Sequence, residues 1–296
     1  METAKYRAFL TAIEKGTFSK AADQMRYTPA GVQQLVTALE QELGLTLLNR
    51  SNKGVTLNKD GERMLPLIKD LLRQESQIQE MASAINGLLV GSISIASYFS
   101  VATHWLPGLI ADFQRMHPNI EFHIMEGPRQ VVLNRLQDKS ADIGFATCIE
   151  PMKMEWIPLH VDPILAIIPK DHPLASEASF PLERCGEEPF IMAANANDED
   201  LMRIFRKSQI VPNVRYSTIN HFSAINMVAH GLGISMMNEL ITGKFDAEVV
   251  KLPLDPPQFI TLGIIVPSVR KARPAIKQFV QYAEKQLKKE ALPATQ

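Results

Sequence analysis

Three short helices are predicted in the first 45 residues, and their order is the feature that most constrains the fold. The first is predicted over residues 4–15, where apolar side chains recur at helical spacing and Gly16 supplies a stop. A second helix is expected to begin near Ser19, a residue type that favours the N-cap, and to run to Met25. The two segments predict a compact helical unit at the N-terminus.

The third predicted helix opens at Thr28-Pro29 and ends at Leu43-Gly44. Threonine is a good N-cap, and proline is favoured at the first helical position because its missing N–H would be unpaired there anyway. A tight turn between two such helices is typical of the unit that places a recognition helix in the major groove of DNA. The buried stripe of this helix is predicted to be Val32, Leu35, Val36 and Leu39, and its outward positions Ala30, Gln33, Gln34, Thr37 and Gln41.

Residues 46–58 are predicted to form two short strands about the turn Ser51-Asn52-Lys53-Gly54. On such a wing, Arg50 and Lys53 are suited to contact phosphate, while glutamine and threonine on the helix are suited to contact bases. The candidate DNA-binding residues are Phe18, Ser19, Lys20, Thr28, Pro29, Ala30, Gln33, Gln34, Thr37, Arg50 and Lys53. Helix spacing alone fits equally well a small helical bundle with a hairpin, whose polar face is merely solvated.

The N-terminal sequence resembles the LysR-type transcriptional regulators. The run FLTAIEKGTFSKAADQMRYTPAGVQQLVTALEQELGLTLLNRSNKGVTLNKDGE follows the opening motif of that family nearly end to end. The matching elements are Gly-Thr-Phe-Ser at 16–19, Ala21-Ala22, Leu39-Glu40, Leu43-Gly44, Leu48, Arg50, Leu57 and Gly61. One position departs from the pattern, because Gln33 stands where the family usually has serine. The resemblance implies that this position faces DNA, so the preferred site can differ from the family's habit.

Residues 59–87 are predicted to form a long linker helix. Met64, Leu71, Ile78 and Ile85 recur every seven residues, accompanied by Gly61, Ile68, Glu75 and Ala82. This is a heptad seam, interrupted by Glu75, that is long enough to pair two chains. Pro66 is expected to kink the helix near its start. The alternative is a single amphipathic helix lying on its own domain, whereas the resemblance implies a linker helix that forms the dimer.

From Leu88 onwards, predicted strands alternate with predicted helices, which indicates a largely parallel sheet with right-handed crossovers. The fold class is therefore α/β behind an N-terminal winged helix-turn-helix. The resemblance implies a two-lobed effector domain related to periplasmic binding proteins, with crossings near Val161-Asp162 and Pro267. The expected domains are 1–58 for DNA binding, 59–87 for the linker and 88–296 for the effector, with lobe I at 88–161 and 268–296 and lobe II at 162–267.

Candidate effector-binding residues lie at strand ends and at the helix starts that follow them, where ligands of α/β sheets bind. They are Ser97, Tyr98, Phe99, Ser100, Thr103, Arg129, Thr147, Cys148, Asn195, Asn197, Thr218, Asn220 and His221. Ser100 and Thr103 also fit simple helix caps, and Cys148 fits a small core residue. Arg129 fits either a carboxylate ligand or an ordinary surface position, and His221 fits either a ligand contact or an exposed loop. These residues allow a small, partly aromatic or carboxylated metabolite.

The charge of the chain argues mildly against DNA binding, because DNA-binding proteins usually carry a basic patch. The chain has a net charge of −1, and residues 1–58 hold seven basic and five acidic side chains. Affinity is therefore expected to depend on pairing of two domains. No apolar run approaches the ~20 residues that a membrane helix needs, the N-terminal segment does not look like a signal peptide, and the two cysteines lie far apart. We expect a cytoplasmic protein.

The sequence contains no GxSxG motif, no P-loop, no GxGxxG after a strand and no histidine or cysteine spacing suited to a metal. We therefore expect no catalytic residues, no cofactor and no metal. The predicted function is a sequence-specific transcriptional regulator whose activity a small-molecule effector modulates. Its expected partners are double-stranded DNA, that effector and further copies of the chain, as a homodimer and a homotetramer. The alternatives are a small-molecule binding protein without a DNA role and an enzyme with an N-terminal adaptor.

Overall fold

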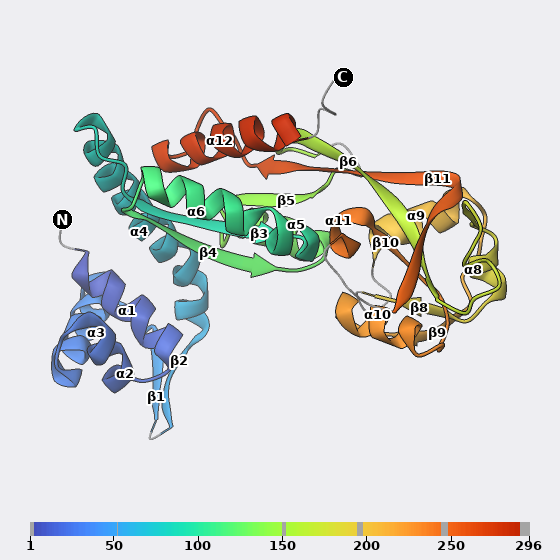
Figure 1. Cartoon of the computed structure of the whole chain (residues 1–296). Coiled ribbons are helices and arrows are strands. Elements are labelled where there is room, and N and C mark those ends of the chain that lie inside the picture. The colour runs from blue at the N-terminus through green and yellow to red at the C-terminus, as the bar shows by residue number, and fades with distance from the viewer. Residues whose placement is uncertain (1–2, 52, 150–151, 194–197, 244–247, 291–296) are drawn as a thin grey trace. The chain divides into compact units, whose positions relative to one another are not determined.

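The computed structural model of the chain describes residues 3–51, 53–149, 152–193, 198–243 and 248–290 (Figure 1). The chain divides into two compact units, residues 1–87 and 88–296. No helix in these described ranges combines the length and the apolar character needed to cross a membrane.

The first unit begins with three helices, α1 (Ala4–Lys15), α2 (Phe18–Met25) and α3 (Pro29–Leu43). As predicted, α1 ends at Gly16, whose φ of 74° is costly for residues with a Cβ atom. The start of α2 differs from the prediction, because the cap is Thr17 and not Ser19. The extended backbone of Thr17 lets its hydroxyl accept a hydrogen bond from the Lys20 amide, so the helix begins one residue earlier.

The start of α3 agrees with the sequence to the residue, since the Thr28 hydroxyl accepts a hydrogen bond from the Gly31 amide at 3.1 Å. Val32, Val36 and Leu39 are fully buried, whereas Leu35 is only partly buried at the edge of the same cluster. The core of this unit thus lies between α1, α2 and α3, and it leaves one polar face of α3 in solvent.

A hairpin of strands β1 (Leu48–Ser51) and β2 (Gly54–Leu57) follows α3. The Val55 amide donates a hydrogen bond of 2.8 Å to the carbonyl of Gly16, which ties the hairpin to the end of α1. Gly54 has a φ of 127°, and a Cβ atom there would lie 2.2 Å from the Gly16 carbonyl oxygen. Only glycine fits this contact, so the position of the wing depends on it.

Helix α4 (Lys59–Ile85) is one continuous helix that includes Pro66. The buried and exposed positions of this helix differ from those that the heptad pattern predicted. Glu75 does not interrupt an exposed seam; it is 5% exposed and accepts hydrogen bonds from Thr3 and Arg7 of the N-terminal segment. The buried row is Gly61, Ile68 and Glu75, and the exposed apolar row is Leu67, Leu71, Ile78, Met81 and Ile85. The residues predicted to accompany the seam therefore mostly face the unit's own core.

The second unit is built on a mixed sheet whose main strand order is β10-β6-β11-β5-β3-β4. The strands are β3 (Gly91–Ser97), β4 (Ile120–Glu126), β5 (Ile143–Thr147), β6 (Glu155–Pro169), β10 (Ser235–Asn238) and β11 (Val249–Val266). Strand β3 runs parallel to β4 and β5, but β11 runs antiparallel to both β5 and β6. The prediction of a largely parallel sheet is therefore wrong, because two long strands return beside each other instead of crossing over a helix.

Helices cover both faces of the sheet in the first lobe. Helices α6 (Leu106–Met116) and α12 (Pro274–Glu290) pack on one face, where the Phe113 and Phe279 rings meet edge to face at 5.2 Å. Helix α7 (Arg129–Gln137) covers the opposite face. The short helix α5 (Phe99–His104) follows β3 directly, so its first turn lies at the end of a sheet strand.

The second lobe contains the smaller elements between β6 and β11. Phe205 of helix α9 (Glu199–Lys207) meets Phe190 of strand β8 (Phe190–Met192) edge to face in the large core cluster. Helix α10 (His221–Ala229) belongs to a separate cluster with β8, β6 and β10. The elements are β7 (Phe180–Pro181), α8 (Arg184–Glu187), β8 (Phe190–Met192), α9 (Glu199–Lys207), β9 (Val214–Ser217), α10 (His221–Ala229) and α11 (Glu239–Thr242).

Strands β6 and β11 run through both lobes and join them, as Figure 1 shows. At the crossing, Asp162 pairs with Ile260. Residues 262–265 of β11 already pair with β5 of the first lobe, whereas Leu254 pairs with β7 of the second. Strand β11 is thus one long strand that pairs with elements of both lobes.

Candidate functional site

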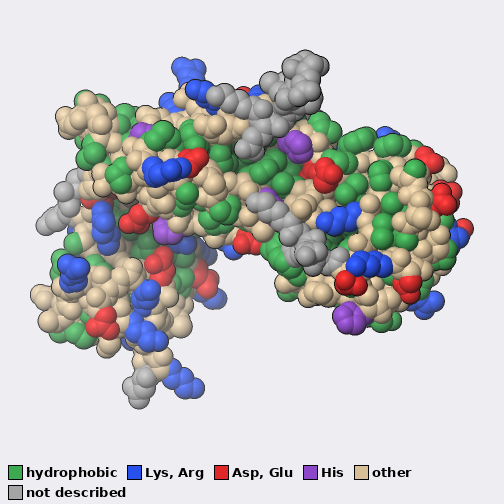
Figure 2. Space-filling model, in the orientation of Figure 1, with side chains coloured by type: hydrophobic (Ala, Val, Ile, Leu, Met, Phe, Trp, Pro, Cys, Tyr) green, Lys and Arg blue, Asp and Glu red, His purple; other side chains and the backbone are tan. Residues whose placement is uncertain are grey.

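The exposed face of α3 carries the side chains predicted to read DNA. Ala30, Gln33 and Gln34 are exposed in its first two turns, and Thr37 is partly exposed one turn later. Lys20, on α2, is also exposed. On the face seen in Figure 2, lysine and arginine side chains gather near the hairpin of this unit. A polar helix face beside basic side chains is the arrangement that base contacts and phosphate contacts require.

The predicted residues Phe18 and Thr28 have structural roles in the same unit. Phe18 is partly buried, and the guanidinium of Arg50 lies over its ring at 5.7 Å from the centroid. Thr28 caps α3, and the neighbouring Pro29 and Ser19 are exposed. Lys53 lies at the exposed end of the hairpin.

Glu40 was missed by sequence reasoning as a functional position, and it connects the wing to α3. Its Oε1 accepts hydrogen bonds from the Leu47 and Leu48 amides at 2.8 and 3.2 Å. Its Oε2 pairs with Arg50 at 2.5 Å, and Arg50 also donates to the Thr37 hydroxyl at 3.3 Å. Arg50 is therefore held against the recognition helix, in contact with a residue predicted to face bases.

The second unit contains a cavity of about 530 Å³ between its two lobes. Six of the predicted effector-binding residues line it: Tyr98, Phe99, Ser100, Arg129, Asn220 and His221. They come from the end of β3, the first turn of α5, the start of α7 and the start of α10. The rule that ligands bind where strands end and helices begin thus selected real cavity positions on both lobes.

The remaining predicted positions lie elsewhere. Ser97 is buried and donates to the backbone carbonyl of Tyr98, and Thr103 is exposed on α5 away from the lining. The Thr218 hydroxyl accepts a hydrogen bond from the Asn220 amide, and Cys148 is partly buried outside the lining. Asn195 and Asn197 lie outside the described residues.

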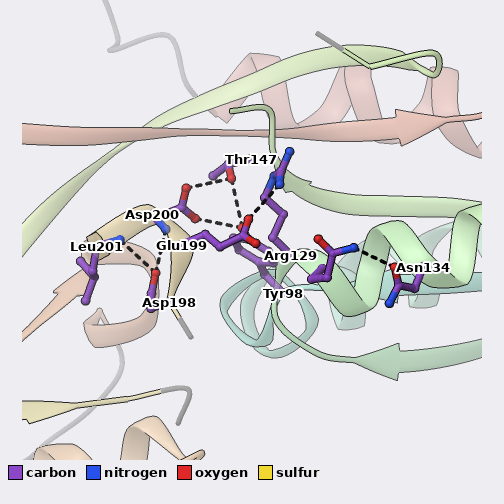
Figure 3. A network of polar contacts seen from close by, with 9 residues as sticks. Tyr98, Arg129, Asn134, Thr147, Asp198, Glu199, Asp200 and Leu201 are labelled. Atoms are coloured by element: carbon purple, nitrogen blue, oxygen red, sulfur yellow. Dashed lines mark hydrogen bonds and ion pairs between the residues drawn. The ribbon is translucent and has the colours of Figure 1, made fainter. Parts of the chain in front are cut away.

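Tyr98 and Thr147 of the first lobe converge on Asp200 of the second (Figure 3). The Tyr98 phenol donates to Asp200 Oδ2 and the Thr147 hydroxyl donates to Oδ1, each at 2.9 Å, and the two hydroxyl oxygens lie 3.0 Å apart. Burial raises the pKa of the Asp200 carboxyl, while the two hydroxyl donors oppose that shift. Burial and the Asp200 charge also hold the pKa of Tyr98 well above its usual range, so the phenol keeps its proton.

A second contact between the lobes joins Arg129 at the start of α7 to Glu199 at the start of α9, at 2.8 Å. The Arg129 side chain is 12% exposed, so it is not an ordinary surface arginine. Next to Glu199, Asp198 Oδ1 accepts the amides of Asp200 and Leu201 and caps α9. Burial, with the nearby Asp200 charge, raises the pKa of Asp198 to about 6.

His221 stacks on Phe99 of the other lobe, with ring centroids 5.6 Å apart and planes inclined by 15°. Burial lowers the pKa of His221 to about 4, so the imidazole is neutral at pH 7. Beside this stack, Ser100 is 1% exposed and lines the cavity. The stack therefore presents an uncharged aromatic surface to a ligand.

Sequence reasoning missed the acidic and apolar parts of the lining. These are Glu126, Asp198, Glu199, Asp200, Met236, Met237, Asn238, Ile241 and Ile260, among others. The acidic run directly follows the strand-end residues that were selected, so the same rule, extended to the start of α9, would have found it. In the described part of the chain, no group of three or more His, Cys, Asp or Glu residues is arranged to hold a metal ion.

Comparison with known proteins identifies both units. Residues 4–62 match the family described as bacterial regulatory helix-turn-helix protein, lysR family, and residues 86–288 match the LysR substrate binding domain. The uncharacterized HTH-type transcriptional regulator YvbU of Bacillus subtilis (strain 168) is 27% identical over 287 residues, covering 96% of this chain and 98% of YvbU. The HTH-type transcriptional activator CmpR of Synechocystis sp. is 25% identical over 238 residues, covering 79% and 78% of the two chains.

Solved structures show the same fold. A full-length OxyR variant from Pseudomonas aeruginosa, in which one cysteine is replaced by aspartate, is similar with a TM-score of 0.71 at 20% identity, covering 97% of each chain. Full-length CbnR in complex with its target DNA is similar with a TM-score of 0.70 at 15% identity, covering 97% of this chain and 100% of CbnR. The chain belongs to the LysR family of bacterial transcriptional regulators, which join a DNA-binding helix-turn-helix to an effector-binding domain.

Proposed function

We propose that this regulator reads its operator with the exposed face of α3 and that a small molecule in the interlobe cavity sets how strongly it binds. The observation that carries the proposal is the set of contacts across the cavity, Tyr98 with Asp200 and Arg129 with Glu199. A ligand that enters between the lobes must keep, stretch or replace these contacts. It thereby favours one closure of the lobes over another.

At the DNA end, Gln33 and Gln34 are the proposed base-reading residues, because glutamine can form paired hydrogen bonds with adenine. Thr37 is proposed as a third contact, positioned by Arg50. Lys20 and Lys53 are proposed to contact phosphate, since both are exposed cations of this unit. The proposed DNA-binding set otherwise keeps the predicted residues, with Phe18 and Thr28 acting through packing and capping.

Two copies of the chain are proposed to pair through the exposed row of α4. Leu67, Leu71, Ile78, Met81 and Ile85 are separated by four, seven, three and four residues. This is the alternating spacing of three and four residues that defines a coiled-coil seam, with the polar Gln74 at one of its positions. A pair of helix-turn-helix domains then binds two half-sites, which compensates for the small positive charge of each domain. The homotetramer stays a prediction that extends this pairing.

We further infer that the chain works in the cytoplasm and that its output is regulation and not catalysis. Its relatives YvbU and CmpR are named as transcriptional regulators, which supports this inference. We propose that the chain passes from one lobe to the other near Asp162 and Ile260, where strands β6 and β11 pair with each other.

The test is binding of the full chain to its own upstream DNA, followed by fluorescence anisotropy over a range of salt concentrations. Thermal-shift screening of a metabolite library first identifies a ligand, since a ligand of the folded state raises its apparent stability. We expect specific binding that weakens steeply with salt and changes when that ligand is added. Gln34→Ala should reduce discrimination against scrambled DNA and leave ligand binding intact. The proposal is wrong if the chain binds its upstream DNA no more tightly than scrambled DNA, both without ligand and with each ligand found. The alternative is then a small-molecule binding protein without a DNA role.

A further inference from the structure

Arg129 forms only part of the hydrogen bonds that a buried guanidinium can form. Its side chain lines the cavity and is largely buried, and its Nη1 donates to Glu199 Oε2 at 2.8 Å (Figure 3). Its Nε is shielded from solvent and has no hydrogen-bond partner among the described residues. A buried N–H without an acceptor is costly, and nearly all buried polar groups have a partner, in the protein or outside it. The described part of the protein therefore supplies no acceptor for one buried donor of this cavity.

The backbone fixes this donor on the first-lobe side of the cavity. Arg129 is the first residue of α7, and the carbonyl of the preceding Pro128 accepts the Val132 amide at 3.1 Å. The Gly127 amide donates to the carbonyl of Ser97, at the end of β3, also at 3.1 Å. These contacts hold the start of α7 against the end of a sheet strand. A donor that the fold holds in place in this way costs a ligand little ordering when it binds.

The positive charge of Arg129 is already balanced, although its hydrogen bonds are not complete. Glu199 pairs with the guanidinium. Burial raises the pKa of the Asp200 carboxyl, and the charge of Arg129 is one of the effects that oppose this rise. Burial also raises the pKa of Asp198 to about 6, so this carboxyl is ionised at pH 7.5. A ligand carboxylate would add a like charge beside these groups, which is unfavourable.

A protonated amine does not satisfy the donor either, because an ammonium group has no lone pair that can accept a hydrogen bond. An uncharged carbonyl oxygen accepts a hydrogen bond and leaves the charge of the lining unchanged. The Nε of Arg129 therefore selects for a neutral oxygen acceptor.

Much of the remaining lining suits the apolar body of such a ligand. Phe99 stacks on the neutral imidazole of His221, and Ile164, Met236 and Ile260 also line the cavity. Apolar walls with a few placed polar groups are typical of small-molecule sites. We propose, resting on the effector-binding function above, that the cavity takes an uncharged carbonyl compound, such as an amide, ketone or ester. Its carbonyl oxygen accepts a hydrogen bond from Arg129 Nε, and its body lies against the apolar lining.

The experiment uses the full chain and a panel of amides, methyl ketones and methyl esters with alkyl or phenylalkyl bodies. Each is matched with the carboxylate, the amine and the hydrocarbon of the same skeleton. 2-Phenylacetamide, phenylacetate, 2-phenylethylamine and ethylbenzene form one such set. Thermal shift and calorimetry at pH 7.5 measure binding. We expect at least one carbonyl compound to bind about ten-fold more tightly than its carboxylate and its amine.

Two variants of Arg129 separate the donor from the charge. Arg129→Met places a methyl group where Nε stands, whereas Arg129→Gln places an amide nitrogen there, and both remove the charge and the ion pair with Glu199. Any effect of that pair on folding is therefore common to the two variants. Arg129→Met should weaken the carbonyl compound about ten-fold and leave the hydrocarbon unchanged, and Arg129→Gln should restore most of that loss. Arg115→Met removes an exposed arginine of α6 outside the lining and should change neither ligand.

The inference is overturned if no carbonyl compound of the panel binds, or if the carboxylates or the amines bind as tightly. It is also overturned if Arg129→Met leaves the affinity for the carbonyl compound unchanged. If Arg129→Gln loses as much affinity as Arg129→Met, the charge and not the Nε donor holds the ligand, which overturns the inference too. These outcomes differ from failure of the proposed function. A charged ligand that binds in the cavity and changes operator binding overturns the carbonyl ligand alone, whereas operator binding that ignores every ligand of the chain overturns the effector role.

Discussion

The Tyr98 phenol and the Asp200 carboxylate, 102 positions apart in the chain, form a hydrogen bond of 2.9 Å across the boundary between the two lobes. Asp200 is 5% exposed, so this bond is largely shielded from water. The contact therefore joins the lobes in a place where a polar group without a partner is costly.

Replacing Tyr98 with phenylalanine should reduce the free energy of unfolding by about 1–2 kcal/mol, because Asp200 loses a buried donor. Urea denaturation measures this change. The matched control is Tyr216→Phe, which removes a hydroxyl from an exposed residue of β9 and should cost little. If both variants lose the same free energy of unfolding, the hydrogen bond between Tyr98 and Asp200 does not stabilise the fold.

The stability of the protein should depend on pH through Asp198. Its pKa is raised from 3.8 to about 6 in the folded chain, so between these values the folded state holds the proton more firmly than the unfolded state. The contribution of this group to stability is therefore greatest below pH 4 and is lost as the pH rises to 6.

Asp198→Asn removes that loss and should gain on the order of 2 kcal/mol relative to the natural chain between pH 4 and pH 7. Denaturation midpoints over this range measure the difference. Asp171→Asn, which removes a carboxyl from an exposed position, is the matched control measured over the same range. A constant difference for Asp198→Asn would mean that the carboxyl titrates normally.

The exposed row of α4 should be required for pairing. Ile78→Glu places a charge in the middle of this apolar row and should shift the chain toward monomer, with weaker operator binding as a consequence. Analytical ultracentrifugation gives the mass. Gln79→Glu adds the same charge beside the row and should stay paired. If Ile78→Glu keeps the mass of the unmodified chain, the pairing surface lies elsewhere.

Glu40 should control how Arg50 acts on DNA. Glu40→Gln keeps an oxygen for the Leu47 and Leu48 amides but removes the charge that holds Arg50. We expect tighter binding to scrambled DNA, a salt slope steeper by about one, and poorer discrimination of the operator as Thr37 loses its donor. Glu42→Gln removes a charge on the same helix, from the pair with Lys5. If Glu42→Gln reduces discrimination as much, Glu40 does not act on DNA binding through Arg50.

The parts of the fold that depend on neighbouring residues could be predicted from the sequence. The start of α3 is one example, since the Thr28 cap and Pro29 act within a single turn. The start of α2 was placed late because Thr17 and Ser19 are both good caps and the pattern does not rank them. Patterns of neighbouring residues thus predicted which helices exist more accurately than they predicted the residue at which each helix begins.

The rest depends on contacts between distant segments. Glu75 looked like a break in a heptad seam because its partners, Thr3 and Arg7, lie about seventy residues away. The antiparallel return of β11 was hidden because its prolines resemble strand breaks, although Pro253 pairs within the strand. The positions of strand ends in the sequence predicted the lining residues Tyr98 and His221. They did not predict which carboxyl groups line the same cavity.

The two-strand connection through β6 and β11 makes the second lobe an insertion within the first. The segment that enters the unit at β3 and the final helix α12 both belong to the first lobe, so the second lobe has no chain end of its own. A change in the second lobe therefore reaches the first lobe through β6 and β11, which pair at Asp162 and Ile260, or through contacts across the cavity such as that of Tyr98 with Asp200.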